Sequence, residues 1–369
     1  MKNLEEEINR VWDIAVYLQM MAAFCVDLDF NEYQLLMLEF HETIKLGDKN
    51  EISTKLYEIE KKLEFIANPL KLKYPLKRNY REIAKDWNNN HKIDNELFSN
   101  GIMIGWLEQQ LDLTNYYHYD YTPYQFKIGL AINKGRGEIE ENFLLQDSFT
   151  SLVKAKKRIK VLDEFAKMQK QKIKSHNKSK FDKEILDSIN LIKYDASFYS
   201  RLTVISFFSF LESFINSIGF DYYYRNKDNL NNIDSQILQG SKNGKYLNLK
   251  DKIEKFQRII RSDKVAKIIL SDNVQIKHPF KPLFENYQEL RNASVHFSPI
   301  KERIWLKPHD WVNIAENLSN LIIEAALQIW QSCHQTTKGP DYLGRLEYKR
   351  LYEIAESREN KISKIENLL

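Results

Sequence analysis

Two side chains near residue 290 have the chemistry that can cleave a phosphodiester without a metal ion. Arg291 carries a permanent positive charge that suits a phosphate, and His296 exchanges protons near neutral pH. Asn292 adds a polar amide beside the arginine. An arginine and a histidine five residues apart also occur by chance, so the meaning of the pair depends on the element that carries it.

That element is a predicted helix from about Pro282 to His296. Pro282 suits a first helical turn, and Pro299 disfavours helical geometry at the residue before it. Between them, apolar or small residues follow at helical steps: Leu283, Tyr287, Leu290 and Ser294. Positions five apart on an ideal helix point about 140° away from each other, so Arg291 and His296 would not converge in mid-helix. We therefore expect His296 in the final turn, where the partial negative charge of the helix end favours imidazolium.

A structural role competes with this interpretation. In that role Arg291 would pair with a neighbouring carboxylate, and His296 would cap the end of its own helix. The spacing and the helical context leave both roles open.

The hexapeptide Arg291–His296 resembles the R-N-x-x-x-H motif of the HEPN superfamily, small α-helical domains that are frequently ribonucleases. The resemblance extends over about residues 190–335, where four predicted helices follow one another in the order expected of such domains. These helices are Phe198–Asn216, a segment that starts at Leu247, the segment that carries the motif, and Asp310–Cys333. Only the hexapeptide is specific, and residues 1–150 resemble no family.

The resemblance implies a mechanism and partners. Active members of the superfamily cleave RNA without a metal, and the arginine and histidine of two domains form one composite site across a dimer interface. Here Arg291 would hold the phosphate, His296 would be the acid–base residue, and Asn292 would orient one of them, with no cofactor. Many members act in toxin–antitoxin or antiphage systems, which implies an antitoxin or defence partner, while others have lost the motif and only bind RNA or proteins.

Glu212 is a further candidate, on the broad apolar helix predicted over Phe198–Phe220. It lies beside a narrow polar stripe whose small side chains would let helices approach closely: Ser206, Ser209, Ser213 and Asn216. A buried carboxylate needs a partner. We hypothesise that Glu212 orients Arg291 or His296.

The strongest charge cluster of the chain lies before that helix. From Lys154 to Lys183 there are twelve Lys or Arg residues and three acidic residues, an excess of nine, whereas the whole chain carries +4. Lys156, Lys157 and Arg158 lie in this run and are candidate RNA-binding residues, because such a run can contact phosphates. The alternative is the solvated face of a long helix in a lysine-rich chain.

The composition predicts an all-α fold and no metal site. Hydrophobic residues make up 43% of the 369 residues and aromatic residues 12%, which is typical of a folded chain. Only 11 Gly and 8 Pro leave few turns, which favours long helices with short connections. Cys25 and Cys333 lie in apolar helical patterns and are predicted to be buried thiols, and no histidine or cysteine cluster suggests zinc.

We predict three segments along the chain. Residues 1–180 form an N-terminal helical domain of unknown type that ends in a long basic helix from Glu138 to about Lys174, and the polar break at Ser175–Lys180 is the boundary. Residues 181–338 form the HEPN-like helical bundle, with Asp310 as N-cap of its last helix. Residues 339–369 form a charged tail helix. Within the bundle, Asn226–Tyr246 is expected to be a long irregular connection.

No stretch has the pattern of a membrane span or an export signal. The longest apolar run, Ile14–Val26, is too short to cross a bilayer, and Glu5–Glu7 has the wrong sign for a secretory signal. A cytoplasmic location is therefore expected. The sequence leaves two functions open: an endoribonuclease that acts as a homodimer on RNA, and a non-catalytic RNA- or protein-binding module whose motif is vestigial.

Overall fold

A computed structural model describes residues 4–24, 28, 30–90, 101–116, 122–128, 137–174, 183–295, 305–366 and 368. Over these residues the fold is all-α, as predicted: thirteen α-helices, α1–α13, are joined by short 3-10 or π segments and by five strands of two residues each. The chain divides into two compact units, Met1–Ile139 and Glu140–Leu369.

The first unit consists of helices and one small sheet. α1 (Leu4–Phe24) packs on α3 (Lys49–Lys73) and α4 (Tyr80–Asn90), and α2 (Phe30–Thr43) packs on α3. The sheet joins the antiparallel strands β1 (Ile102–Met103), β2 (Lys127–Ile128) and β3 (Gly137–Glu138), and α5 (Ile104–Gln110) follows β1. The core includes one face of α1: Val11, Ile14, Ala15, Leu18 and Met21. Cys25, which was predicted to be buried, lies outside the described residues.

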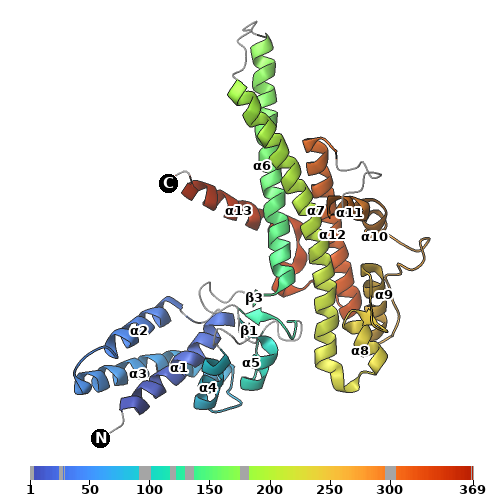
Figure 1. Cartoon of the computed structure of the whole chain (residues 1–369). Coiled ribbons are helices and arrows are strands. Elements are labelled where there is room, and N and C mark those ends of the chain that lie inside the picture. Colours follow the sequence, from blue (N-terminus) through green and yellow to red (C-terminus); the bar gives the residue numbers. More distant parts are fainter. Residues whose placement is uncertain are drawn as a thin grey trace. The chain divides into compact units, whose positions relative to one another are not determined.

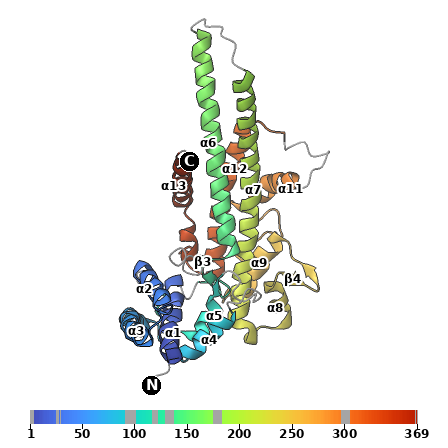
Figure 2. The same ribbon diagram turned by 60° about the vertical axis from the view of Figure 1, so that its left-hand side comes forward.

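The second unit is built around two long helices. α6 (Glu140–Lys174) and α7 (Lys183–Asn226) lie side by side in both views (Figures 1 and 2). The helix expected over Glu138–Lys174 is confirmed as α6, and the helix expected over Phe198–Phe220 is confirmed within α7. At 1.5 Å per residue, α7 spans about 66 Å, so helices far apart in sequence can pack along it.

Two C-terminal helices complete this bundle. α12 (Pro308–His334) packs on α7 and α6, and α13 (Tyr348–Glu366) packs on α6 after the 3-10 segment η5 (Asp341–Leu346). The prediction of Asp310 as N-cap is wrong: Lys307 is the N-cap of α12 and Pro308 takes the first position, where a missing N–H costs nothing. Cys333 is buried as predicted, and burial raises the pKa of its thiol to about 12.

The segment after α7 is ordered, so the prediction of a long irregular connection is wrong. The 3-10 turn η2 (Lys227–Asn229), α8 (Asn232–Leu238) and a hairpin of β4 (Ser241–Lys242) and β5 (Lys245–Tyr246) fill it. Asn243 and Gly244 turn the hairpin with φ of 52° and 75°. An Asn-Gly pair between two strands is a strong hairpin signal, because both positions need positive φ.

α9 (Leu249–Ile260) packs on α7, α8 and α12. Gly219 of α7 lies against both α8 and α9. A Cβ added there would lie 2.4 Å from the Phe256 ring and 2.7 Å from the Leu238 carbonyl oxygen. This close packing fixes the position of α9 against α7, and α9 in turn holds the loop that follows it.

The boundary between the units lies after residue 139, and the prediction of a boundary at residue 180 is wrong. α6 belongs to the second unit because its apolar side joins that core through Leu145, Phe149 and Val153. The predicted tail segment 339–369 joins the same core through Leu343, Leu346 and Ala355. The predicted linker Ser175–Lys180 lies outside the described residues. The apolar side of α6 predicted a helix, but the sequence did not show which unit that side packs against.

The segment Ile185–Asn229 is long and apolar enough to cross a membrane by length and composition alone. In the structure, 61% of its most apolar window is buried. The core helix of a bundle passes the same test as a membrane span, and burial of this window inside protein is what a core helix requires.

Candidate functional site

The motif lies at the end of a helix whose geometry changes along its length. α10 (Phe280–Pro282), the π-helical segment η3 (Leu283–Tyr287) and α11 (Gln288–Val295) follow one another without a break. The predicted helix is thus confirmed, with a wider turn in its middle that the sequence pattern did not reveal. π-helical turns inside α-helices frequently occur at functional sites. Buried residues hold this helix in the bundle, where it contacts α7 and α12: Leu283, Phe284, Leu290 and Ala293.

Arg291 is half-buried on α11, and the next residue orients its guanidinium. Nη1 of Arg291 donates a hydrogen bond to Oδ1 of Asn292 over 3.1 Å. Leu290 and Ala293 on either side are buried, so the core fixes the backbone, while Arg291 itself is only partly buried. The structure therefore brings Arg291 and Asn292 together, as an orienting role for Asn292 requires.

His296 lies outside the described residues, as do all positions from 296 to 304. Its distance from Arg291 is therefore not part of the described geometry. α11 is described up to Val295, which is exposed. The motif arginine thus lies in the last described turn of this helix, and the convergence of Arg291 and His296 stays a prediction.

Glu212 has a different environment from the one expected. Its side chain on α7 is 47% exposed and lies 3.3 Å from Nζ of Lys252 on α9, whose own side chain is only 8% exposed. The expectation of a buried carboxylate is wrong, because the polar stripe of α7 reaches the surface at this position. The ion pair links α7 to α9, and Arg291 donates to Asn292 instead.

Two of the three predicted RNA-binding residues are engaged within the bundle. Lys156 on α6 donates to Glu316 on α12 over 2.5 Å, and Arg158 donates to Asp195 on α7 over 3.3 Å. Lys157 between them is half-buried. The basic run therefore helps to fix α6 against its neighbours. Because two of its cations already pair with carboxylates, fewer positive charges are available to a ligand than the sequence suggests.

A network of buried polar groups on α9 holds the loop that follows it. Oε1 of Gln257 accepts hydrogen bonds from the backbone N–H groups of Lys267 and Ile268 over 2.9 and 3.1 Å, and from the Ser332 hydroxyl over 2.6 Å. Gln257 is fully buried. The sequence contained a signal for this role, since Gln257 falls four residues after Ile253 on the apolar side of α9.

Glu254 of α9 supports the same loop one turn earlier. Its carboxylate accepts hydrogen bonds from the backbone N–H groups of Leu270 and Ser271, each over 3.0 Å. Burial alone would raise the pKa of Glu254, but these hydrogen bonds and that from Arg258 outweigh it, so the pKa lies below its ordinary value. The carboxylate is therefore kept ionised by the groups it holds in place.

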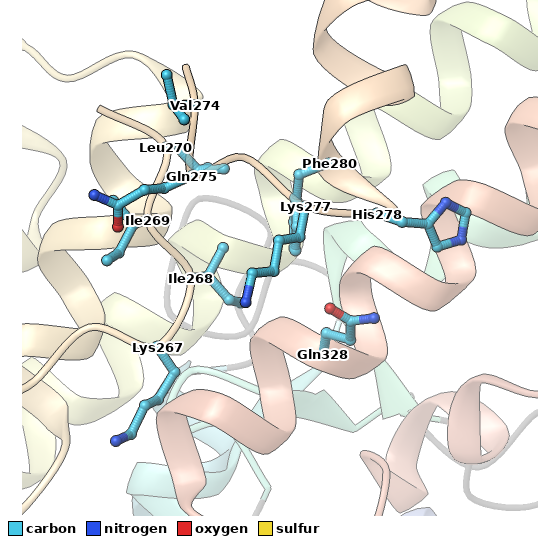
Figure 3. A pocket seen from close by; sticks show the side chains of 10 residues that line it. All are labelled: Lys267, Ile268, Ile269, Leu270, Val274, Gln275, Lys277, His278, Phe280 and Gln328. Atoms are coloured by element: carbon cyan, nitrogen blue, oxygen red, sulfur yellow. The ribbon is translucent and has the colours of Figure 1, made fainter. Parts of the chain in front are cut away.

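Between this loop and α12 lies a cavity of about 390 Å³ (Figure 3). Its lining combines basic, amide and apolar side chains: Lys267, Ile268, Ile269, Leu270, Val274, Gln275, Lys277, His278, Phe280 and Gln328. The sequence did not predict this cavity, because it forms where residues 267–280 meet Gln328 of α12, which lies far along the chain.

A buried carboxyl lies at the start of α6. Glu141 accepts a hydrogen bond from the Tyr342 hydroxyl over 3.3 Å, and burial raises the pKa of Glu141 to about 7 against the stabilising contact of the Ser217 hydroxyl. Tyr342 belongs to η5 and Ser217 to α7, so this carboxyl joins three segments of the second unit. Its surroundings are packed side chains, which suits a structural role.

Comparison of the chain with protein-family models, with curated proteins and with solved structures finds no match in any of the three. Among the described residues, no group of three or more His, Cys, Asp or Glu side chains is placed to hold a metal ion. The function must therefore be argued from the motif, its helix and the surfaces of the second unit.

Proposed function

We propose that the chain is a metal-independent endoribonuclease of the HEPN type that acts as a homodimer. The observation that carries this proposal is the motif that begins at Arg291, which lies in the last described turn of α11 with its guanidinium hydrogen-bonded to the Asn292 amide. A permanently charged, planar guanidinium suits a phosphate, and imidazole suits proton transfer near neutral pH.

In the proposed reaction the ribose 2′-hydroxyl attacks the adjacent phosphorus. The P–O bond to the 5′-oxygen breaks, which leaves a 2′,3′-cyclic phosphate and a 5′-hydroxyl. The proton of the 2′-hydroxyl leaves with a base, and the departing 5′-oxygen gains a proton, with His296 as the acid–base group. Arg291 stabilises the charge that builds on the phosphoryl oxygens.

An exposed apolar stripe on α7 supports the dimer in this proposal. Its members recur at helical spacing and are exposed in the single chain: Leu191, Tyr194, Phe198 and Leu202. Contiguous exposed apolar side chains often mark protein interfaces. The helix that carries the motif contacts α7, so a second subunit on this stripe would lie on the helix that supports Arg291.

The first test is cleavage of a single-stranded RNA by the full chain in excess EDTA. Products with a 2′,3′-cyclic phosphate and a 5′-hydroxyl are expected, and both Arg291→Ala and His296→Ala should abolish them while the melting temperature is unchanged. Cleavage preserved in both variants would end the proposal.

The second test concerns the dimer. Tyr194→Glu should lower both the fraction of dimer, measured by light scattering, and the cleavage rate. Tyr57→Glu places the same charge at an exposed tyrosine of the first unit and should change neither. Equal dimer fractions in the two variants would remove the stripe from the interface.

A non-catalytic binding module is the second candidate function. The observation that favours it is that Glu212, the group hypothesised to orient the motif, pairs with Lys252 instead. This function predicts RNA or protein binding without cleavage, and a loss of stability on truncation of Arg291. In either case we propose a role in a toxin or antiphage-defence system with an antitoxin or defence partner, with RNA contacts from Lys157 in addition to the motif.

A further inference from the structure

The cavity between the 261–279 loop and α12 has two features of a built ligand site. It has a defined volume of about 390 Å³, within the range typical of small-molecule sites. Its loop wall is fixed from behind by the buried Gln257 and Glu254, whose side chains accept four backbone N–H groups of that loop. The wall is therefore formed before any ligand binds, which lowers the ordering cost of binding.

The charge of the lining favours an anion. Lys267, Lys277 and His278 are basic, and no carboxylate lines the cavity. In Figure 3 the Lys277 side chain extends toward the side of the cavity where Ile268 is drawn, while Lys267 lies at another edge. Lys267 is 4.0 Å from Asp263 and His278 is 2.9 Å from Glu324, so both are partly balanced by neighbouring carboxylates. Lys277 is the group best placed to meet an anion inside the cavity.

The rest of the lining favours a flat apolar body with polar edges. Ile268, Leu270 and Phe280 supply apolar walls. Gln275 and Gln328 supply amide groups that already donate one hydrogen bond each, to Asp272 and Glu324, and whose oxygen and second N–H can bind a ligand. Glutamine amides suit the edge of a nucleobase, and lysine suits a phosphate. A simple inorganic anion would use the lysine and leave the apolar walls uncovered.

We infer that this cavity binds a nucleotide, with its phosphate on Lys277 and its base between Ile268, Phe280 and Gln328. The site is separate from Arg291. Phe280 and Arg291 are eleven residues apart on the same continuous helix, which is about 16 Å at the rise of an α-helix. The nucleotide is either a free mononucleotide or one residue of an RNA strand, and the inference does not depend on cleavage at the motif.

The test is a calorimetric titration of the full chain with adenosine 5′-monophosphate. Saturable binding is expected, with Lys277→Ala weakening it about tenfold, the effect of one lost charge-assisted hydrogen bond. Lys281→Ala is the matched control, because Lys281 is exposed one helical turn further on and does not line the cavity; its affinity should stay within about twofold of the original. Adenosine and inorganic phosphate should each bind more weakly than the nucleotide.

The source of the nucleotide is distinguished with pentaadenylate, titrated into Arg291→Ala so that strand cleavage does not interfere. Tighter binding of pentaadenylate than of the mononucleotide, still dependent on Lys277, assigns the cavity to an RNA residue; equal or weaker binding assigns it to a free nucleotide. Two results overturn the inference: phosphate binding as tightly as the nucleotide, or no difference between Lys277→Ala and Lys281→Ala with either ligand. Because the titration measures binding alone, a failed cleavage assay and a failed titration remain separate results.

Discussion

Two polar regions of the second unit use their side chains in opposite ways. On α9, Glu254 and Gln257 are buried, and their hydrogen bonds hold the 261–279 loop. At the end of α11, Arg291 is only half-buried and donates to its own neighbour, Asn292. A buried polar group without partners is costly, so it must bind protein, whereas an accessible one can bind a ligand. The comparison separates groups that maintain the structure from groups that are free to act on a substrate.

The largest effect is expected at the accessible arginine. Arg291→Ala should lower RNA cleavage by a factor of about 10² to 10³ or more, because it removes charge stabilisation of the phosphoryl oxygens. Unfolding in urea should change by less than about 0.5 kcal/mol, as is usual for a surface side chain. A loss of several kcal/mol of stability instead would place Arg291 with the buried, structural groups and favour the binding-module function.

The opposite result is expected for the buried amide. Gln257→Ala leaves two backbone N–H groups and the Ser332 hydroxyl without their acceptor, at about 1 to 3 kcal/mol for each buried group, so unfolding in urea should be easier by at least about 3 kcal/mol. Gln239→Ala, at an exposed glutamine of α8's C-cap, should cost less than about 0.5 kcal/mol. Equal costs in the two variants would contradict the structural role of α9.

Glu141 is also buried, but unlike Gln257 it can gain or lose a proton. Its pKa is about 7 in the folded chain and 4.5 in the reference state, so between these values the folded chain holds a proton that the unfolded chain has released. The contribution of Glu141 to the free energy of unfolding is therefore most favourable below pH 4.5 and decreases as the pH rises toward 7. Glu141→Gln should remove this dependence and stabilise the chain at pH 8 by at most about 3 kcal/mol, measured by urea unfolding at pH 5 and pH 8.

The control for that measurement is Glu140→Gln, since Glu140 is the exposed residue beside it. Its unfolding free energy should follow the same pH dependence as the original chain. If Glu141→Gln behaves in the same way as Glu140→Gln, the buried carboxyl does not control the pH dependence of stability.

The smallest effect is expected at the partly buried ion pair of Lys156 and Glu316. Both side chains are partly solvated, so Lys156→Gln should cost no more than about 1 kcal/mol, and less in high salt. The same variant should leave RNA affinity nearly unchanged, because Lys156 already has a carboxylate partner, whereas Lys157→Gln should weaken it and reduce its salt dependence. A larger loss of affinity with Lys156→Gln than with Lys157→Gln would show that the ion pair opens for RNA.

The sequence predicted elements better than it predicted their partners. The helical spacing of Leu283 and Leu290 and the apolar pattern of α6 gave the correct helices, since such patterns depend on residues three or four apart. The predicted boundary at residue 180 was placed by the run of lysines, which can be seen in the sequence. The packing of α6 on α7 and α12 involves residues far along the chain, so the sequence did not show it. The N-cap at Asp310 failed because Pro308 is better suited to the first position of α12.

At the candidate site, too, some properties follow from the sequence and others depend on tertiary contacts. The types and order of Arg291, Asn292 and His296 are properties of the sequence, and so is the chemistry that they offer. The exposure of Glu212 and its contact with Lys252 are not, since the two residues are 40 positions apart. The cavity beside Lys277 also depends on Gln257 and Gln328, which lie on different helices.

Sequence alone determined that this chain is helical, where most of its second-unit helices run, and which side chains have the chemistry that the proposed reaction needs. Tertiary structure decided which polar groups are buried, which charges are neutralised and where a cavity remains. The physical reason is that helix formation depends on neighbours within a turn or two, whereas burial and ion pairing depend on segments such as α6 and α12, whose contacting residues Lys156 and Glu316 are 160 positions apart.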